Sequence, residues 1–245
     1  MALRMTDSNS NFSGTLAEEQ VNALIALYSQ GRLEEAVEKA HILIEKFPHE
    51  FVLFNILGAV NMGLNQLDAA IQSFNRVIQI QPDYADAYGN LGHALHRNGD
   101  LVAAIHNFSQ AVELDPNGTL AHINLGNALQ ENGDLTGAIK SFEQAIEKSP
   151  EFAEAYINLG VALQESGALT AAIKNLRHAL LLKPNFAEGH NNLGNILREN
   201  GDLTGAIESY NQAIKINPNY ADGYNNLGTA LKDTGRLADA ISSFK

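Results

Sequence analysis

The sequence contains no cysteine and no tryptophan, and it carries little positive charge. The lack of cysteine excludes disulfides, thiolate metal sites and a cysteine nucleophile, and it fits a reducing compartment. Only 16 basic residues stand against 28 acidic ones, which gives a net charge of −12 without any basic block. Nucleic acids and anionic membrane surfaces attract proteins chiefly through cationic side chains, so we expect neither as a partner.

Long apolar stretches are absent as well. The first residues, MALRMTDSNSNFSGTL, include one Arg and no apolar run of the length that a signal peptide needs. No later stretch is long and apolar enough to span a bilayer. We therefore predict a cytoplasmic protein that does not enter a membrane.

Proline is scarce, but its six copies are evenly placed. They lie 34 residues apart, at Pro48, Pro82, Pro116, Pro150, Pro184 and Pro218. The stretch NLGNALQENGDLTGAIKSFEQAI, from residue 124, and the stretch NLGNILRENGDLTGAIESYNQAI, from residue 192, are identical at 18 of 23 positions. The chain is therefore an array of seven 34-residue repeats beginning at residues 17, 51, 85, 119, 153, 187 and 221. We number the slots of each repeat from these starts.

Each repeat has the pattern of two helices joined by a tight turn. In the repeat from residue 85, apolar or small residues recur with the three-and-four spacing of a helix face, at Tyr88, Leu91, Gly92 and Leu95 and again at Ala104, Ile105, Phe108 and Ala111. Gly99 lies between the two runs, where a helix can end in the left-handed conformation. The Pro after the second run ends that helix, because it lacks an N–H and disfavours helix before it. We therefore predict an all-α chain of helical hairpins.

These residues resemble the tetratricopeptide repeat, over residues 17–245. The family pattern has a Leu-Gly pair at slots 7 and 8, found here as Leu57-Gly58, Leu91-Gly92, Leu125-Gly126, Leu159-Gly160, Leu193-Gly194 and Leu227-Gly228. It also has Ala at slot 20, found as Ala36, Ala70, Ala104, Ala138, Ala172, Ala206 and Ala240. The resemblance implies a right-handed α-solenoid whose first helices line a concave groove. We expect the Gly to lie opposite the Ala, so that the two helix backbones approach closely.

The two ends depart from the repeat pattern. The repeat at 17–50 has Leu24 in place of the Gly and Ala40 in place of the aromatic at slot 24, so we interpret it as an N-terminal cap. Thr15 and Glu18 have the spacing of a capping box, which leaves residues 1–16 as a mobile tail. The seventh repeat ends early, at Lys245, which we interpret as truncation of a longer protein.

Asparagine recurs at slot 6, which in this family points into the groove. An Asn side chain offers one acceptor and two donors, the complement of a peptide's main-chain groups. The row resembles the asparagine ladder of O-linked N-acetylglucosamine transferases, with Ile56 as a departure. With two Asn at slot 9, the predicted peptide-binding residues are Asn90, Asn124, Asn127, Asn158, Asn192, Asn195 and Asn226. The alternative is that slot-6 Asn bonds within the fold.

Acidic residues flank this row in the later repeats. They occupy slot 13 as Glu131, Glu165, Glu199 and Asp233, and slot 2 as Glu154, Glu188 and Asp222. One hypothesis is that they favour an extended segment carrying Lys or Arg, and the alternative is a solvated acidic rim. The groups lie at spacings close to a Debye length, so salt dependence separates the two.

The sequence offers no motif for catalysis, and we predict no catalytic residue, no metal site and no cofactor. The function that the pattern favours is a non-catalytic protein–protein interaction scaffold that binds a protein or peptide in its groove. Two alternatives remain open. The array resembles those ahead of catalytic domains in bacterial glycosyltransferases and sulfotransferases, and it could therefore recruit substrates for a larger enzyme. It could also self-associate through an open apolar C-terminal end.

Overall fold

A computed structural model describes residues 18–243 of the chain. The tail at 1–16 that the sequence predicts to be mobile lies outside this range, as do Thr15 and Lys245. The described residues form α-helices joined by short turns, with no strand among them. None of these helices has the length and apolar character needed to cross a membrane.

Helices alternate along the described chain as the first and second members of each repeat. The first helices are α1 (Glu18–Ser29), α3 (Phe51–Gly63), α5 (Ala85–Arg97), α7 (Thr119–Glu131), α9 (Ala153–Glu165), α11 (Ala187–Glu199) and α13 (Ala221–Asp233). The second helices are α2 (Leu33–Lys46), α4 (Leu67–Ile80), α6 (Leu101–Leu114), α8 (Leu135–Lys148), α10 (Leu169–Leu182), α12 (Leu203–Ile216) and α14 (Leu237–Ser243). The predicted all-α hairpin architecture is thus confirmed.

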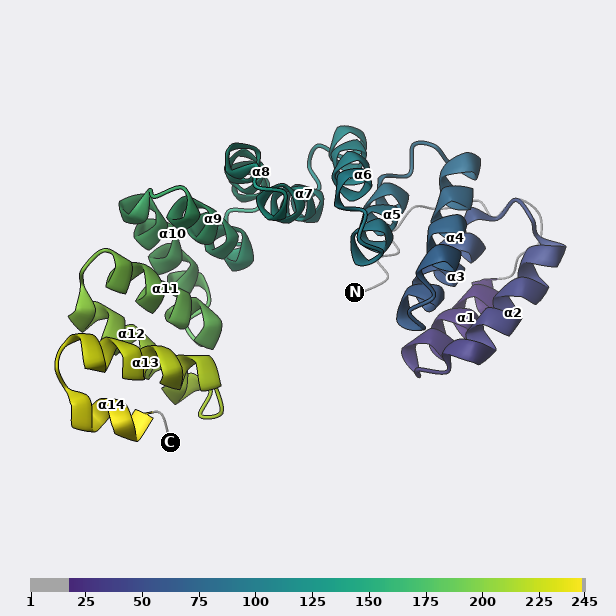
Figure 1. Cartoon of the computed structure of the whole chain (residues 1–245). Coiled ribbons are helices and arrows are strands. Elements are labelled where there is room, and N and C mark those ends of the chain that lie inside the picture. Colours follow the sequence, from purple (N-terminus) through teal and green to yellow (C-terminus); the bar gives the residue numbers. More distant parts are fainter. Residues whose placement is uncertain (1–17, 244–245) are drawn as a thin grey trace. The chain divides into compact units, whose positions relative to one another are not determined.

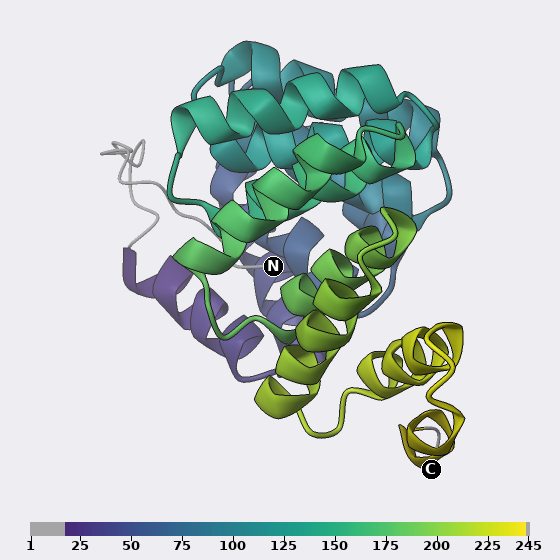
Figure 2. The same cartoon turned by 90° about the vertical axis from the view of Figure 1, so that its left-hand side faces the viewer.

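The chain contacts divide the array into two compact bodies, residues 1–117 and residues 118–245. Helices α1 to α6 belong to the first body and α7 to α14 to the second (Figure 1). Within each body a second helix packs against its own first helix and against the first helix of the next repeat. At the end of the second body, α14 lies beside α13 (Figure 2).

Consecutive first helices of a body also contact each other, as α7 does α9, α9 does α11 and α11 does α13. Consecutive second helices make no contact of comparable extent in the described chain. The first-helix side is therefore the inner side of the stack in each body. Residues at the same slot of these helices form rows along that inner surface.

The turns inside the hairpins use the left-handed backbone conformation. Gly99 has φ of 87° and Gly133 of 83°, and the corresponding glycines of the other repeats lie between 73° and 84°. In the second repeat Asn65 replaces Gly at φ of 58°, a conformation that Asn tolerates better than most residues. The second helix then starts with a cap in several repeats, as where the Asp134 side chain accepts a hydrogen bond from the Gly137 N–H.

The glycines at slot 8 make room for a large side chain. A Cβ built on Gly126 would lie 2.5 Å from the ring of Phe142, at slot 24 of the same repeat. The same holds for Gly194 and the ring of Tyr210. The slot-20 Ala predicted opposite this Gly is also a neighbour in the fifth repeat, where a Cβ on Gly160 would lie 3.4 Å from the main-chain oxygen of Ala172, but the slot-24 side chain is nearer. The aromatic ring rests on the bare backbone, and Phe142 and Tyr210 are both fully buried.

In the first repeat the large and the small residue of this contact are exchanged between the two helices. Leu24 stands at slot 8 and is fully buried, while Ala40 at slot 24, also fully buried, supplies the small side chain. Both belong to one apolar cluster. The large residue has moved from the second helix to the first, which keeps the volume of the core roughly constant.

Candidate functional site

The inner surface of the second body holds six of the seven predicted Asn residues. Asn124 and Asn127 lie on α7, Asn158 on α9, Asn192 and Asn195 on α11, and Asn226 on α13. Asn127 is exposed and the others are half-buried. The seventh predicted residue, Asn90, lies on α5 of the first body. In that body the row also contains Ile56, which is fully buried and offers no polar group.

Part of the Asn row is tied to the preceding repeat by hydrogen bonds. Nδ2 of Asn226 donates to Oδ1 of Asn191 over 2.9 Å, and Nδ2 of Asn158 donates to Oδ1 of Asn127 over 3.1 Å. In the first body Nδ2 of Asn90 donates to Oδ1 of Asn55 over 3.1 Å. These three residues therefore bond within the fold, as the alternative interpretation of the row has it. Each amide keeps its oxygen and a second N–H for other partners.

The acceptors of two of these bonds were missed at the sequence level. Asn55 and Asn191 stand at slot 5, and both are buried, with 6% and 5% of their surface exposed. The sequence did offer a signal for them, because each slot-5 Asn is followed by a slot-6 Asn in the next repeat. By contrast, Asn124 and Asn192 make no side-chain hydrogen bond to a described residue.

The acidic rim forms a second ladder, because slot 12 of one repeat reaches slot 13 of the next. Nε2 of Gln130 donates to Glu165 over 2.8 Å, and Nε2 of Gln164 donates to Glu199 over 2.6 Å. The same step in the next repeat is an ion pair of 3.9 Å between Arg198 and Asp233. The Gln and Arg partners were not predicted, although the recurrence of Gln at slot 12 was visible in the sequence.

The remaining rim residues differ in how far their charge is compensated. Glu154 forms an ion pair of 2.7 Å with Lys183, and the hydrogen bond from that lysine lowers the pKa of the Glu154 carboxyl. Glu188 and Asp222 are exposed. Glu165 and Glu199 accept hydrogen bonds from the neutral amides of Gln130 and Gln164, which bring no positive charge to these carboxyl groups. The surface therefore stays acidic at these four positions, and it is locally neutral where Lys183 and Arg198 reach it.

One hollow joins both ladders. It has a volume of about 570 Å³ and is lined by Gln164, Asn195, Arg198, Glu199 and Asn226. Two predicted Asn residues and one predicted rim carboxylate thus come together on α9, α11 and α13. The hydroxyl of buried Tyr210 donates to Oδ1 of Asn195, which leaves the Asn195 NH₂ group as a donor. The hollow therefore combines amide donors, amide acceptors, a guanidinium and a carboxylate.

The first body presents a different arrangement on its inner side. Arg97 stands at slot 13, where the second body has acids, and its guanidinium donates to the main-chain oxygen of Met62 and to Oδ1 of Asn65. The two bonds measure 2.9 Å and 2.7 Å. The acidic ladder is thus a property of the second body. The described residues hold no cluster of three or more His, Asp or Glu with metal-binding geometry.

Family models match most of the repeats. Models described as TPR repeat or tetratricopeptide repeat match residues 62–99, 85–117, 107–140, 126–167, 153–186 and 194–235. The chain is a tetratricopeptide repeat protein. A curated relative of this TPR protein is a probable UDP-N-acetylglucosamine–peptide N-acetylglucosaminyltransferase, SEC, from Arabidopsis thaliana, 33% identical over 74 residues. The match covers 30% of this chain and only 8% of that protein.

Several solved structures share the fold. The C-terminal part of a TPR repeat-containing protein from Cytophaga hutchinsonii has a TM-score of 0.74 at 18% identity, covering 91% of this chain and 93% of that one. MamA is 28% identical, with a TM-score of 0.58 over 63% of this chain and 90% of its own. YrrB, described as a TPR protein with an unusual peptide-binding site, has a TM-score of 0.63 at 19% identity, covering 76% and 96%. A fold of this kind supports protein–protein interaction.

Proposed function

We propose that this TPR protein is a non-catalytic scaffold that binds an extended peptide segment along the first helices of its second body. The observation that carries the proposal is the row of Asn124, Asn158, Asn192 and Asn226 at one slot of four successive first helices. Packed helices lie about 8 to 10 Å apart, which is close to the length of three residues of extended chain. Successive Asn amides can therefore meet main-chain groups of an extended peptide at regular intervals.

The free energy of hydrogen bonds limits the affinity that the Asn row can provide by itself. A hydrogen bond contributes about 0.5 to 1.5 kcal/mol net, whereas association costs at least about 4 kcal/mol in lost freedom. Four amides therefore give weak binding that tolerates many peptide sequences. The hollow lined by Gln164, Asn195 and Arg198 supplies the additional contacts in this proposal.

The rim carboxylates are proposed to select a peptide that carries Lys or Arg. No cation pairs with Glu165, Glu199, Glu188 or Asp222 among the described residues of the second body. An exposed pair of opposite charges contributes up to about 1 kcal/mol and is screened by salt. Titrating one basic peptide at low and at high salt tests this part, because affinity that does not fall with salt contradicts it.

The experiment that tests the proposal uses the two Asn residues without structural bonds. Random short peptides are selected against the full chain, and the affinity of the selected peptide is then measured by fluorescence anisotropy. We expect the double substitution Asn124→Ala with Asn192→Ala to weaken binding about tenfold, the effect of two lost hydrogen bonds. Its stability should not fall, because neither side chain bonds to a described residue.

A matched control replaces two Asn residues on the second helices. Asn75 and Asn211 both stand at slot 25 and are exposed on α4 and α12. The variant Asn75→Ala with Asn211→Ala should bind the peptide as the unmodified chain does. Equal affinity of all three proteins would refute the Asn row as the binding surface.

A second candidate is association of the chain through α14. Leu237 and Ile241 are 60% and 58% exposed on this last described helix, as an unpaired helix face would be. If this face mediates association, the mass measured by sedimentation rises with concentration. The variant Leu237→Lys with Ile241→Lys should then stay monomeric. A mass that stays that of a monomer at all concentrations rejects this candidate.

A further inference from the structure

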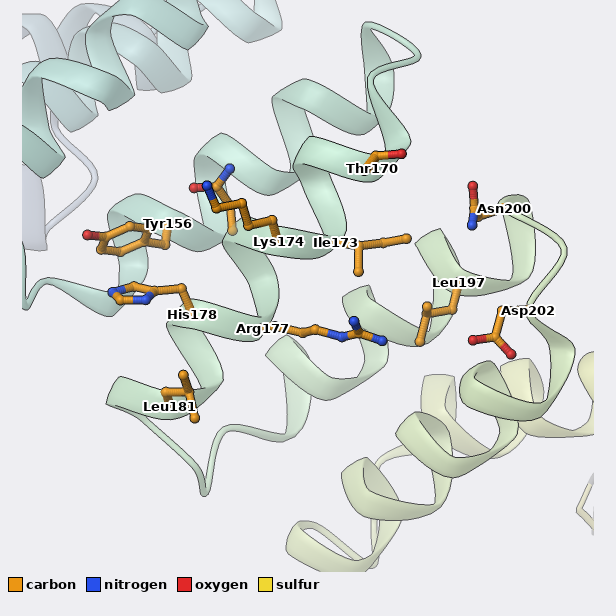
Figure 3. A pocket seen from close by; sticks show the side chains of 11 residues that line it. Tyr156, Thr170, Ile173, Lys174, Arg177, His178, Leu181, Leu197, Asn200 and Asp202 are labelled. Carbon is orange, nitrogen blue, oxygen red and sulfur yellow. The ribbon is translucent and has the colours of Figure 1, made fainter.

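A second hollow lies on the α10 side of the second body, away from the Asn row. Its volume is about 700 Å³, and it is bounded by α10, by Tyr156 of α9 and by the turn between α11 and α12 (Figure 3). Lys174, Arg177 and His178 of α10 line it, and Asp202 is its one carboxylate. In the close-up Arg177 extends toward Leu197 of α11, and His178 lies against Tyr156.

The combination of three basic side chains at the slots that line this hollow is peculiar to the fifth repeat among the described helices. Slots 22, 25 and 26 hold Lys174, Arg177 and His178 in α10, but Lys140, Glu143 and Gln144 in α8 and Glu208, Asn211 and Gln212 in α12. The fold of the repeat needs none of the three, because α12 forms the same helix with a different residue at each of these slots and α8 shares only the Lys at slot 22. Nor does Lys174 or Arg177 form an ion pair with a described residue.

Slot 29 shows a second departure in the same repeat. In the second, third and fourth repeats the side chain at slot 26 bonds to the one at slot 29, as Arg76 does to Gln79, Gln110 to Glu113 and Gln144 to Glu147, over 3.0, 2.9 and 3.1 Å. In α10 slot 29 is Leu181, which cannot accept such a bond and is 78% exposed. His178 instead packs against Tyr156, with ring centroids 4.4 Å apart and the ring planes tilted by 48°.

We propose that this hollow docks an acidic peptide segment that carries a large apolar side chain. The carboxylates of the segment face Lys174 and Arg177, and its apolar side chain packs on Leu181 and on the Tyr156–His178 pair. The cationic hollow stands out in a chain of net charge −12, and an exposed Leu beside unpaired cations combines the two chemistries that such a segment presents. This surface is distinct from the Asn row, since none of its lining residues belongs to that row or to the acidic rim.

The test is an anisotropy titration of the full chain with a labelled, end-blocked peptide of Glu residues around a Leu-Leu pair. Two further peptides have Gln in place of every Glu, or Ser in place of both Leu. We expect the first peptide to bind and both others to bind at least about tenfold more weakly. Binding of none of them, or equal binding of all three, would overturn the proposal.

Variants locate the peptide on the protein. Lys174→Glu and Leu181→Glu should each weaken binding of the Glu–Leu peptide about tenfold, with helical circular dichroism unchanged because both side chains are exposed. The matched control is Lys140→Glu, the same charge change at the same slot of α8, where we expect less than about a twofold effect. An equal effect of Lys140→Glu would mean that only net charge is sensed. Self-association that Lys174→Glu abolishes would assign the hollow to a second copy of the chain, and either result rejects the proposal.

Discussion

The hydroxyl of Tyr210 donates a hydrogen bond of 2.9 Å to Oδ1 of Asn195, which connects the core of α12 to the inner surface of α11. Tyr210 is fully buried, and burial raises the pKa of its phenol, so the hydroxyl keeps its proton and remains a donor at neutral pH. The bond holds the Asn195 carbonyl in place inside the hollow. A core residue thereby orients a residue of the proposed peptide surface.

We predict that Tyr210→Phe lowers the free energy of unfolding by about 0.5 to 1.5 kcal/mol, the net value of one hydrogen bond. The ring itself should still fit, since Phe142 occupies the same slot in α8. Denaturant unfolding followed by circular dichroism measures the change. The control Tyr224→Phe removes a hydroxyl that bonds to no described residue and should change the stability little. Equal stability of both variants would contradict a structural role for the Tyr210 hydroxyl.

Two glycines of α5 should respond to alanine in opposite directions. A Cβ on Gly92 would lie 2.7 Å from the Phe108 ring, whereas a Cβ on Gly89 would meet nothing within 4 Å. Gly92→Ala is therefore expected to lower the free energy of unfolding by about 1 to 3 kcal/mol through overpacking. Gly89→Ala should raise it by about 0.5 to 1 kcal/mol through helix propensity. Thermal unfolding of the two variants provides the comparison, and shifts of the same sign would refute it.

The Asn residues of the inner row should differ in their structural importance. Asn226→Ala leaves the buried Oδ1 of Asn191 without its donor, so we expect a loss of about 1 to 3 kcal/mol of unfolding free energy. Asn158→Ala should cost less, because its acceptor Asn127 is exposed and can bond to water. Asn192→Ala should be neutral or slightly stabilising. Denaturant unfolding of the three single variants measures this order, and a large loss in Asn192→Ala would contradict it.

His93 should make the stability depend on pH. Burial, with a smaller contribution from His96, lowers the pKa of His93 below its ordinary value of 6.5, and its ring packs edge-on against Phe108 at a centroid distance of 5.1 Å. Below pH 6.5 the unfolded chain therefore binds the proton before the folded protein does. The free energy of unfolding should fall as the pH decreases from about 6.5 toward the lowered pKa.

The variant His93→Asn tests this prediction, because Asn127 and Asn195 occupy the same slot in other repeats. Denaturant unfolding is measured between pH 5 and pH 8 for both proteins. We expect a shallower loss of stability toward low pH in the variant than in the unmodified chain. Parallel curves would mean that other histidines determine the pH dependence.

Much of the fold follows from local sequence signals. The 34-residue period predicts the hairpins, and the recurring Gly predicts the left-handed turns that the structure shows at Gly99 and Gly133. Both signals act within a few residues of chain, through helix periodicity and backbone sterics. The division into two bodies between Asn117 and Gly118 has no such signal, since the repeat at 119 follows the pattern of its neighbours.

The hydrogen-bond partners of the candidate site residues could not be predicted from local sequence signals. The sequence predicts which Asn and acidic residues share a row, because equal slots recur every 34 residues. It does not predict that Asn226 bonds to Asn191, that Gln164 bonds to Glu199, or that Tyr210 reaches Asn195 from the neighbouring helix. Those pairings depend on how side chains of neighbouring packed helices are oriented, and a displacement of a few ångströms would break them.

The sequence by itself therefore determined the repeat, the helices and the surface on which each slot falls. The tertiary structure alone decided which amides are used inside the fold and which, such as Asn124 and Asn192, make no side-chain hydrogen bond to a described residue. The physical reason is the distance along the chain over which each signal acts. The helix periodicity and the turn residues are both encoded within one repeat. The hydrogen bonds between successive first helices join residues 31 to 35 positions apart and form only when the repeats have stacked.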